Sequence, residues 1–176
     1  MRLVSLTNRT AIDATASDEV EVLLIRISHP EITDPIRLST DPTAIVTVDP
    51  LVYGTYSTWM IPADTSAPQP YLFGLISVQL PDDQEDQPQA AKIVLEVVDQ
   101  DMAAPLRSTT TRGTVDLAVV LASSPDVIEA EWTNLDLVTA EGDAATITLS
   151  LSRQPISSEP YPARRMTRNA FPGLHR

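Results

Sequence analysis

Two apolar runs in the middle of the chain restrict the possible folds most strongly. Ile93–Val98 and Val115–Leu121 are rich in β-branched residues and flank a polar connection of about fifteen residues. In each run alternate residues are apolar, which is typical of a half-buried strand. The other positions are mixed and include Glu96 and Asp116. The pattern predicts a sheet with one apolar face, which further strands have to cover.

Other strand-like runs recur along the chain, and most end at a proline, a glycine or an acidic turn. They are Glu19–Ser28, Ile36–Leu38, Ala44–Val48, Leu51–Tyr56, Tyr71–Leu80, Val127–Trp132, Asn134–Val138 and Ala145–Ser152. With the central pair they make roughly eight to ten strands of ordinary length. The sequence therefore predicts an all-β fold, an antiparallel β-sandwich or barrel-like domain with short helical turns, over residues 19–152.

The two ends of the chain differ from this domain. Residues 1–18 predict a short helix capped by Thr7 or Asn8, or alternatively an arm without regular structure. Residues 153–176 predict an extended arm, because four prolines and the lack of a periodic pattern exclude an interior strand. This arm also contains Tyr161, Met166, Phe171 and Leu174, which indicates that it lies on a protein surface.

Two features within the domain leave alternatives open. Residues 57–70 form a long, proline-rich loop that contains Trp59, Met60 and Ile61. These apolar residues either fold back onto the core or contact a neighbouring chain. Gly74, inside the run Tyr71–Leu80, predicts a bulge or a close crossing.

Charge is unevenly distributed along the sequence. The net charge is −12, but residues 153–176 hold five arginines and one acid, so this arm is +4 and the rest of the chain is −16. An acidic body disfavours nucleic-acid binding and favours head-to-tail contact between copies, because the arm of one attracts the body of the next. The alternative is that the acidic surface only keeps the protein soluble.

The residues predict no catalytic, cofactor or metal site, and so no enzyme. The chain has no cysteine, which excludes disulfides, zinc–thiolate sites and cysteine nucleophiles. Its two histidines, His29 and His175, lack an accompanying nucleophile or acid motif. Asp99 and Asp101 have no histidine or nucleophile nearby in the sequence, so we interpret them as helix-capping residues.

Two further sequence patterns bear on metal binding and location. The acidic stretch PDDQEDQP lacks the ligand pattern and glycine of a calcium loop, and predicts a solvated hairpin loop. Neither a signal peptide nor an apolar run long enough to span a membrane is present, so we expect synthesis in the cytoplasm without a membrane anchor.

Four stretches spread along the chain carry a resemblance to a known family. They are VEVLLIRISHPEITDPIRLSTD, LPDDQEDQPQAAKIVLEVVDQDMAAPLR, VDLAVVLASSPDVIEAEW and PYPARRMTRNAFPGL. The chain resembles a family of short siphophage tail-tip or minor tail proteins, described as a domain of unknown function. The resemblance covers about four fifths of the sequence. It departs at Trp59–Gln69, where family members have a shorter link.

The resemblance implies a structural component of the virion, in the tail tip or baseplate and made in the host cytoplasm. It would form a ring or hub between the tail tube with its tape measure and the central fibre or receptor-binding proteins. Its first partner would be itself, with six copies in a ring that matches the tube or three in a hub. An acidic lumen would suit DNA passage without specific binding.

In that setting the C-terminal arm is expected to contact the next copy. The hypothesised subunit interface contains Arg164, Arg165, Arg168, Phe171, Leu174, Trp59 and Met60. The alternative function is a carbohydrate- or receptor-binding β-sandwich module. In that module, Trp59, Trp132 and Tyr56 would stack on the ligand.

Overall fold

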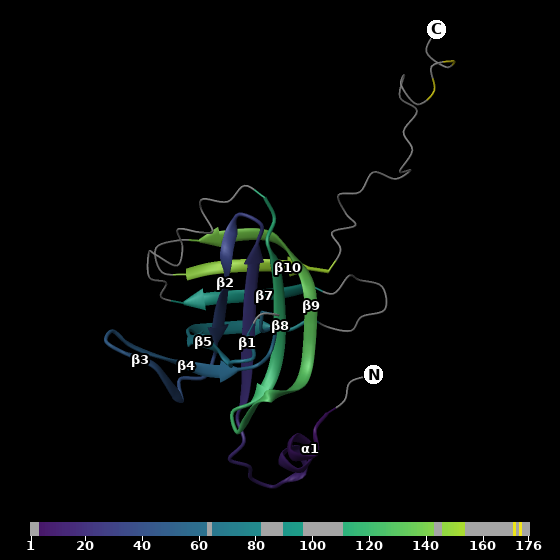
Figure 1. Cartoon of the computed structure of the whole chain (residues 1–176). Coiled ribbons are helices and arrows are strands. Elements are labelled where there is room, and N and C mark those ends of the chain that lie inside the picture. Colours follow the sequence, from purple (N-terminus) through teal and green to yellow (C-terminus); the bar gives the residue numbers. More distant parts are fainter. Residues whose placement is uncertain are drawn as a thin grey trace.

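The computed structural model describes residues 4–62, 65–81, 90–96, 111–142 and 146–153, together with Phe171 and Gly173. Within these residues there is one helix, α1 (Leu6–Asp13), and ten strands that belong to a single sheet (Figure 1). The strands are β1 (Glu21–His29), β2 (Ile32–Ser39), β3 (Ala44–Val48), β4 (Leu51–Ser57), β5 (Gln69–Phe73), β6 (Leu75–Gln79), β7 (Ala90–Glu96), β8 (Thr114–Leu121), β9 (Ser124–Gly142) and β10 (Thr146–Ser152). The predicted all-β fold is confirmed.

The strand order in the sheet is β3-β4-β5-β2-β1-β8-β9-β10-β7-β6. Neighbouring strands are antiparallel, as the sequence predicts, except that β2 and β5 run parallel. This parallel pair forms because β5 returns to β2 only after the β3–β4 hairpin. No helix in the described part of the chain is long and apolar enough to cross a membrane.

The sheet bends at β9 and so forms two layers. The first part of β9 pairs with β8 and the last part with β10. Figure 1 shows β9 curving along one side, between the upright strands β1, β2 and β8 and the strands β7 and β10 that run across them. Strands that change layer through a bend are typical of orthogonally packed sheets. Val127–Trp132 and Asn134–Val138, predicted as two strands, are therefore parts of one bent strand.

Asn134 marks the bend. Its φ of 57° lies in the left-handed region, which asparagine tolerates better than most residues. Its backbone N–H donates to Asp116 Oδ1 on β8 at 2.9 Å. The ladder between β8 and β9 shifts register near this point, between Val115 and Leu117. A polar contact therefore fixes the position at which β9 changes direction.

Gly74 forms the opposite corner. The structure divides the predicted strand Tyr71–Leu80 here, so that β5 pairs with β2 while β6 pairs with β7. The Gly74 N–H donates to the carbonyl oxygen of Ser39 at 3.0 Å. The chain itself thus joins the two layers at this corner. Among the described strands β6 pairs only with β7, so its other edge is unpaired. This edge faces β1 across an open seam in the barrel formed by the two layers, because residues of β6 and β1 line one groove there.

The main core fills the space between the two layers. Its buried residues come from five strands of the barrel and from β2; they are Leu23, Ile25, Ile27, Leu38, Ala91, Ile93, Val115, Leu117, Val119, Ala130, Leu135, Ile147, Leu149 and Leu151. Alternate residues of β1 and β8 point the other way. Val22, Leu24, Ala118 and Val120 form a second buried cluster there with Trp59 and Tyr71. The face predicted to be mixed is therefore also covered, because the loop after β4 folds over it.

The N-terminal segment forms the predicted short helix. Its N-cap is Ser5, not Thr7 or Asn8, because the Ser5 Oγ accepts a hydrogen bond from the Asn8 N–H at 3.1 Å. The Ser5 N–H donates to Glu129 Oε2 on β9 at 2.8 Å. Together these contacts tie the start of α1 to the barrel.

Candidate interaction surface

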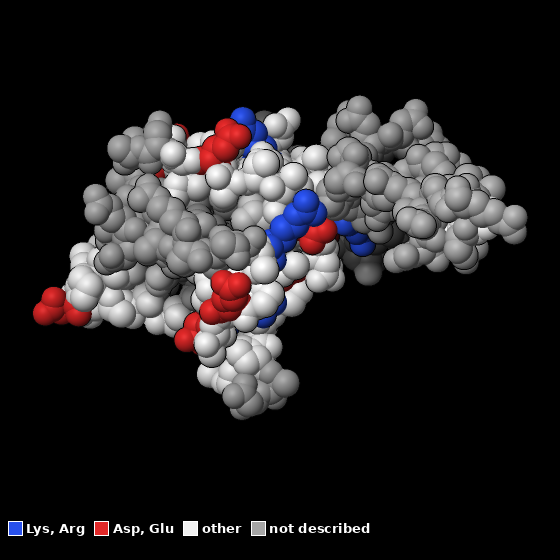
Figure 2. Space-filling view, turned by 90° about the horizontal axis from the view of Figure 1, so that it is seen from above, with Lys and Arg blue, Asp and Glu red and all other residues white. Residues whose placement is uncertain are grey.

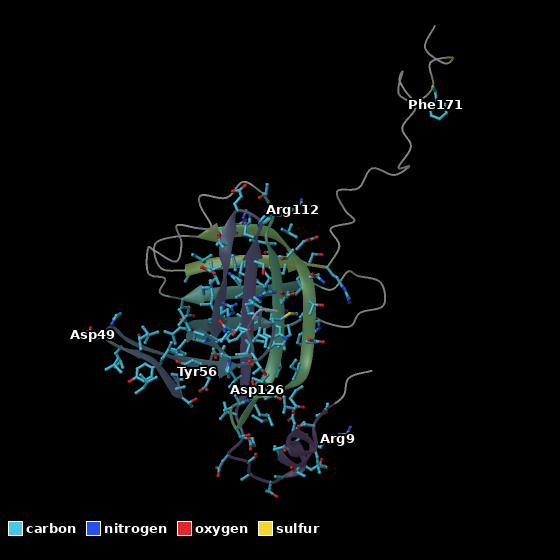
Figure 3. The ribbon with its side chains drawn as sticks, viewed as in Figure 1. Arg9, Asp49, Tyr56, Arg112, Asp126 and Phe171 are labelled. Carbon is cyan, nitrogen blue, oxygen red and sulfur yellow. The ribbon has the colours of Figure 1, made fainter. Side chains whose placement is uncertain are left out.

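The β3–β4 hairpin projects from the barrel (Figure 1), and Figure 3 places Asp49 at its tip, away from the body, with Tyr56 closer to the barrel. Four apolar side chains of the hairpin are largely exposed: Ile45 54%, Val48 80%, Leu51 56% and Tyr53 40%. Soluble monomers rarely gather such residues without a partner. The hairpin is therefore the first candidate for an interaction surface.

These four residues lie on one face of the hairpin. Val48 pairs with Leu51 and Ile45 with Tyr53, and directly opposite residues of a ladder share a face. Leu51 and Tyr53 are two positions apart on β4, so both pairs point to the same side. The register shift between Ile45 and Thr47 makes this possible. We call this set of four side chains the hairpin face.

A buried polar network holds the base of the hairpin. The hydroxyl oxygens of Ser39 and Thr55 lie 2.9 Å apart, and the Thr55 hydroxyl also reaches Asp41 Oδ2 at 3.3 Å. A Cβ added at Gly54 would overlap the carbonyl oxygen of Tyr71, so only glycine allows β4 and β5 to approach here. Satisfied networks of this kind rigidify a structure. The hairpin therefore projects in a fixed direction.

Trp59, one of the residues with two open interpretations, folds back onto the core. Its side chain is 5% exposed, and its ring centroid lies 6.0 Å from that of Tyr71. Asp126 holds the loop from the other side, because its Oδ1 accepts from the Thr58 N–H at 2.7 Å and the Thr58 hydroxyl at 2.8 Å. Met60 has a φ of 51° and packs, half-buried, on the same cluster. A neighbouring chain cannot reach the Trp59 ring unless this cluster opens.

Tyr71 gives this cluster a pH dependence. Its hydroxyl donates to the carbonyl oxygen of Trp59 at 2.7 Å, and burial raises the pKa of Tyr71 from 10.0 to about 12. Between these two values the unfolded chain loses this proton while the folded protein keeps it, so the free energy of unfolding falls as pH rises. We expect a loss of about 2–3 kcal/mol across that interval.

The measurement is urea unfolding of the wild type and of Tyr71→Phe at several pH values from 9 to about 12, a range that starts below the lower pKa and ends near the upper one. The variant lacks the phenol and is expected to lose less stability over this range. Equal slopes for the two proteins would contradict the assignment.

The stacking platforms of the carbohydrate-binding alternative are not displayed together. Trp59 is buried, and Trp132 packs half-buried against the main core. Tyr56 alone of the three is exposed, and it lies on the side of β4 opposite to Leu51 and Tyr53. The geometry therefore offers no flat surface made by these three rings.

Several residues singled out in the sequence lie outside the described residues. They are Asp99, Asp101, residues 82–88 of the acidic stretch PDDQEDQP, and Arg164, Arg165, Arg168 and Leu174 of the C-terminal arm. Of the arm residues assigned to the interface, Phe171 is described, with a partly exposed ring. The interface role of the arm stays a prediction.

A second surface feature lies at the open seam. A groove of about 220 Å³ runs between β6 and the start of β1, lined mainly by apolar side chains. Its walls include Leu23, Thr40, Ile76, Val78, Leu80 and Val119. Leu23 and Val119 belong to the main core, so the groove reaches the interior of the barrel. We call it the seam groove; its one charged wall residue is Glu21.

The sequence contained a signal for the hairpin that the prediction did not use. Ala44–Val48 and Leu51–Tyr56 were expected as strands, and the structure confirms both. Apolar residues occupy adjacent as well as alternate positions around Asp49–Pro50. A two-stranded hairpin with apolar residues on both faces cannot bury both against one barrel.

The described surface carries no sign of a metal centre. No three His, Cys, Asp or Glu side chains gather closely enough to bind a metal ion in the described ranges. Figure 2, which views the molecule from above, shows acidic side chains spread over the surface with a few basic ones among them.

No family model matches the chain, and no curated protein is significantly similar to it, so the resemblance to phage tail proteins stays a prediction.

Proposed function

We propose that the protein is a structural component of a bacteriophage tail tip or baseplate. It assembles with its own copies into a ring or hub between the tail tube and the central fibre or receptor-binding proteins. The observation that carries the proposal is the hairpin face, an apolar surface on a projecting and rigidly based hairpin. A subunit that assembles needs such a surface, because apolar side chains are removed from water when a neighbouring subunit covers them.

The charge distribution supports the same proposal. The C-terminal arm is +4 and the rest of the chain is −16, so opposite charges of neighbouring copies attract. Eleven of the twelve basic residues are arginine, which forms two parallel hydrogen bonds with a carboxylate. In this assembly the arm would add polar contacts around an apolar centre supplied by the hairpin.

The test is to locate the protein in purified particles of the phage that encodes it. Antibodies against the chain are expected to label one end of the tail in electron micrographs, and mass spectrometry of the particles is expected to detect it. Antibodies against the major tube protein provide the control, since they label the whole tail. Complete tails that lack the chain would contradict the proposal.

A further inference from the structure

We infer that the tip of the β3–β4 hairpin of one copy inserts into the seam groove of a second copy. The inference rests on the proposed function in that it assigns the contact between copies of an assembling subunit. It concerns only described residues and does not involve the C-terminal arm.

The first step concerns the end of the hairpin. Val48 and Leu51 are opposite each other in the ladder and flank the Asp49–Pro50 turn. Their side chains therefore form one apolar wedge at the end of the projection, and Val48 is the most exposed large apolar residue described. A narrow wedge of this kind packs better into a groove than against a flat surface.

The second step is the size of the groove. A closed apolar cavity of about 150 Å³ holds one benzene molecule. The seam groove, at about 220 Å³, therefore has room for two aliphatic side chains such as those of Val48 and Leu51. Its walls present Ile76 and Val78, which point to the same side of β6, and Leu80, which directly follows that strand. The wedge and the groove walls are therefore both apolar.

The third step is the area that a stable contact needs. The hairpin face covers on the order of a few hundred Å², whereas a stable interface buries roughly 800 Å² on each partner. Two hairpin faces packed against each other would fall short of that area. Insertion into the groove also covers the flanks of the hairpin and the mouth of the groove, including the exposed Leu80. This favours the groove over a symmetric contact between two hairpins.

The fourth step is the charge on the two surfaces. Asp49 is the one charged residue of the hairpin, and Glu21 is the one charged residue that lines the groove. Both are acidic, so the contact holds through apolar burial, and salt screens the repulsion between them. Self-association through the hairpin is therefore expected to persist or strengthen at high salt. A contact made by the arginine-rich arm on an acidic surface would weaken instead.

The experiment measures the mass of the purified full-length chain by sedimentation at concentrations up to roughly 100 µM, where contacts of modest affinity are populated. The hairpin variant is Val48→Asp with Leu51→Asp, and the groove variant is Leu80→Lys. Each is expected to weaken self-association at least tenfold. The two variants mixed together are expected to form a one-to-one complex, because the groove variant keeps its hairpin and the hairpin variant keeps its groove.

Two control variants match these changes. Leu6→Asp with Ile12→Asp removes comparably exposed apolar side chains from α1, and Gln79→Lys places the same new charge one residue away, on the other side of β6. Both are expected to associate like the wild type. Circular dichroism spectra that match the wild type show that each variant is folded.

Several results would overturn the inference. They are a monomeric wild type, a groove variant that associates as well as the wild type, or a mixture of variants that forms no complex. The labelling of phage particles is independent of these results. A monomeric chain that labels the tail tip would remove the hairpin contact and keep the proposed function, and an oligomeric chain absent from tails would do the reverse.

Discussion

Trp59→Ala is expected to lower the free energy of unfolding by about 3–5 kcal/mol, the usual cost of removing a large buried aromatic side chain. The indole is 5% exposed and packs on Tyr71 and on the outward-facing residues of β1 and β8. Its loss would leave a cavity between the loop and the sheet, since the contacts of Thr58 with Asp126 still hold the loop in place. Urea unfolding measures the change.

Tyr56→Ala is the matched control for this substitution. It also removes an aromatic ring, but from an exposed position on the hairpin, and is expected to change stability by less than about 1 kcal/mol. If both variants unfold at the same urea concentration, Trp59 is not a core residue. Weakened binding to a glycan array in a stable Trp59 variant would instead favour a stacking platform.

Asp116→Ala is expected to cost about 3–4 kcal/mol, in the lower part of the range for breaking a buried ion pair because Arg26 is partly exposed. The Asp116 carboxylate accepts two hydrogen bonds. Its Oδ2 accepts from Arg26 Nη1 at 3.2 Å, and its Oδ1 accepts from the Asn134 N–H at 2.9 Å. Alanine would leave the guanidinium unpaired and free the bend of β9.

Asp116→Asn separates these two roles. The amide oxygen can still accept from Asn134, but the negative charge beside Arg26 is lost, so we expect an intermediate destabilisation. Asp49→Ala at the exposed hairpin tip is the control for removal of an acid, with an expected change below about 0.5 kcal/mol. Urea unfolding of the three variants tests the order, and equal midpoints for Asp116→Ala and Asp49→Ala would contradict it.

Local periodicity was sufficient to predict most strands. The runs Glu19–Ser28, Ala44–Val48 and Val115–Leu121 correspond closely to β1, β3 and β8. Alternation reports burial on one side of a strand, and it does so whichever strands are paired. For the same reason it could not predict the parallel pairing of β2 with β5, which depends on residues far apart in the sequence.

The two corners were harder to predict. Gly74 was expected to mark a bulge or a close crossing. The sequence around it does not show that the chain passes from one layer to the other at this residue. At Asn134 the pattern predicted the end of one strand and the start of another, because the bend interrupts the alternation. The continuity of β9 depends on Asp116, eighteen residues earlier on the neighbouring strand.

The candidate surface could not be predicted from periodicity, because apolar alternation normally indicates burial. Val48 and Leu51 were expected only as parts of two short strands, and the projection of the hairpin leaves both side chains exposed. Trp59 shows the opposite case. It lies in a polar, proline-rich loop, but the outward face of β1 and β8 requires a cover, and the indole supplies it.

The chain passes between the two layers both at β9 and at Gly74, and this has a consequence for how the domain comes apart. Neither layer can separate from the other without breaking a strand that also belongs to its neighbour. Partial opening of one layer would therefore expose the shared core of both, so loss of structure is expected to be all-or-none across the barrel. A subunit with shared strands of this kind is expected to withstand a force applied to either layer without separation of the two layers.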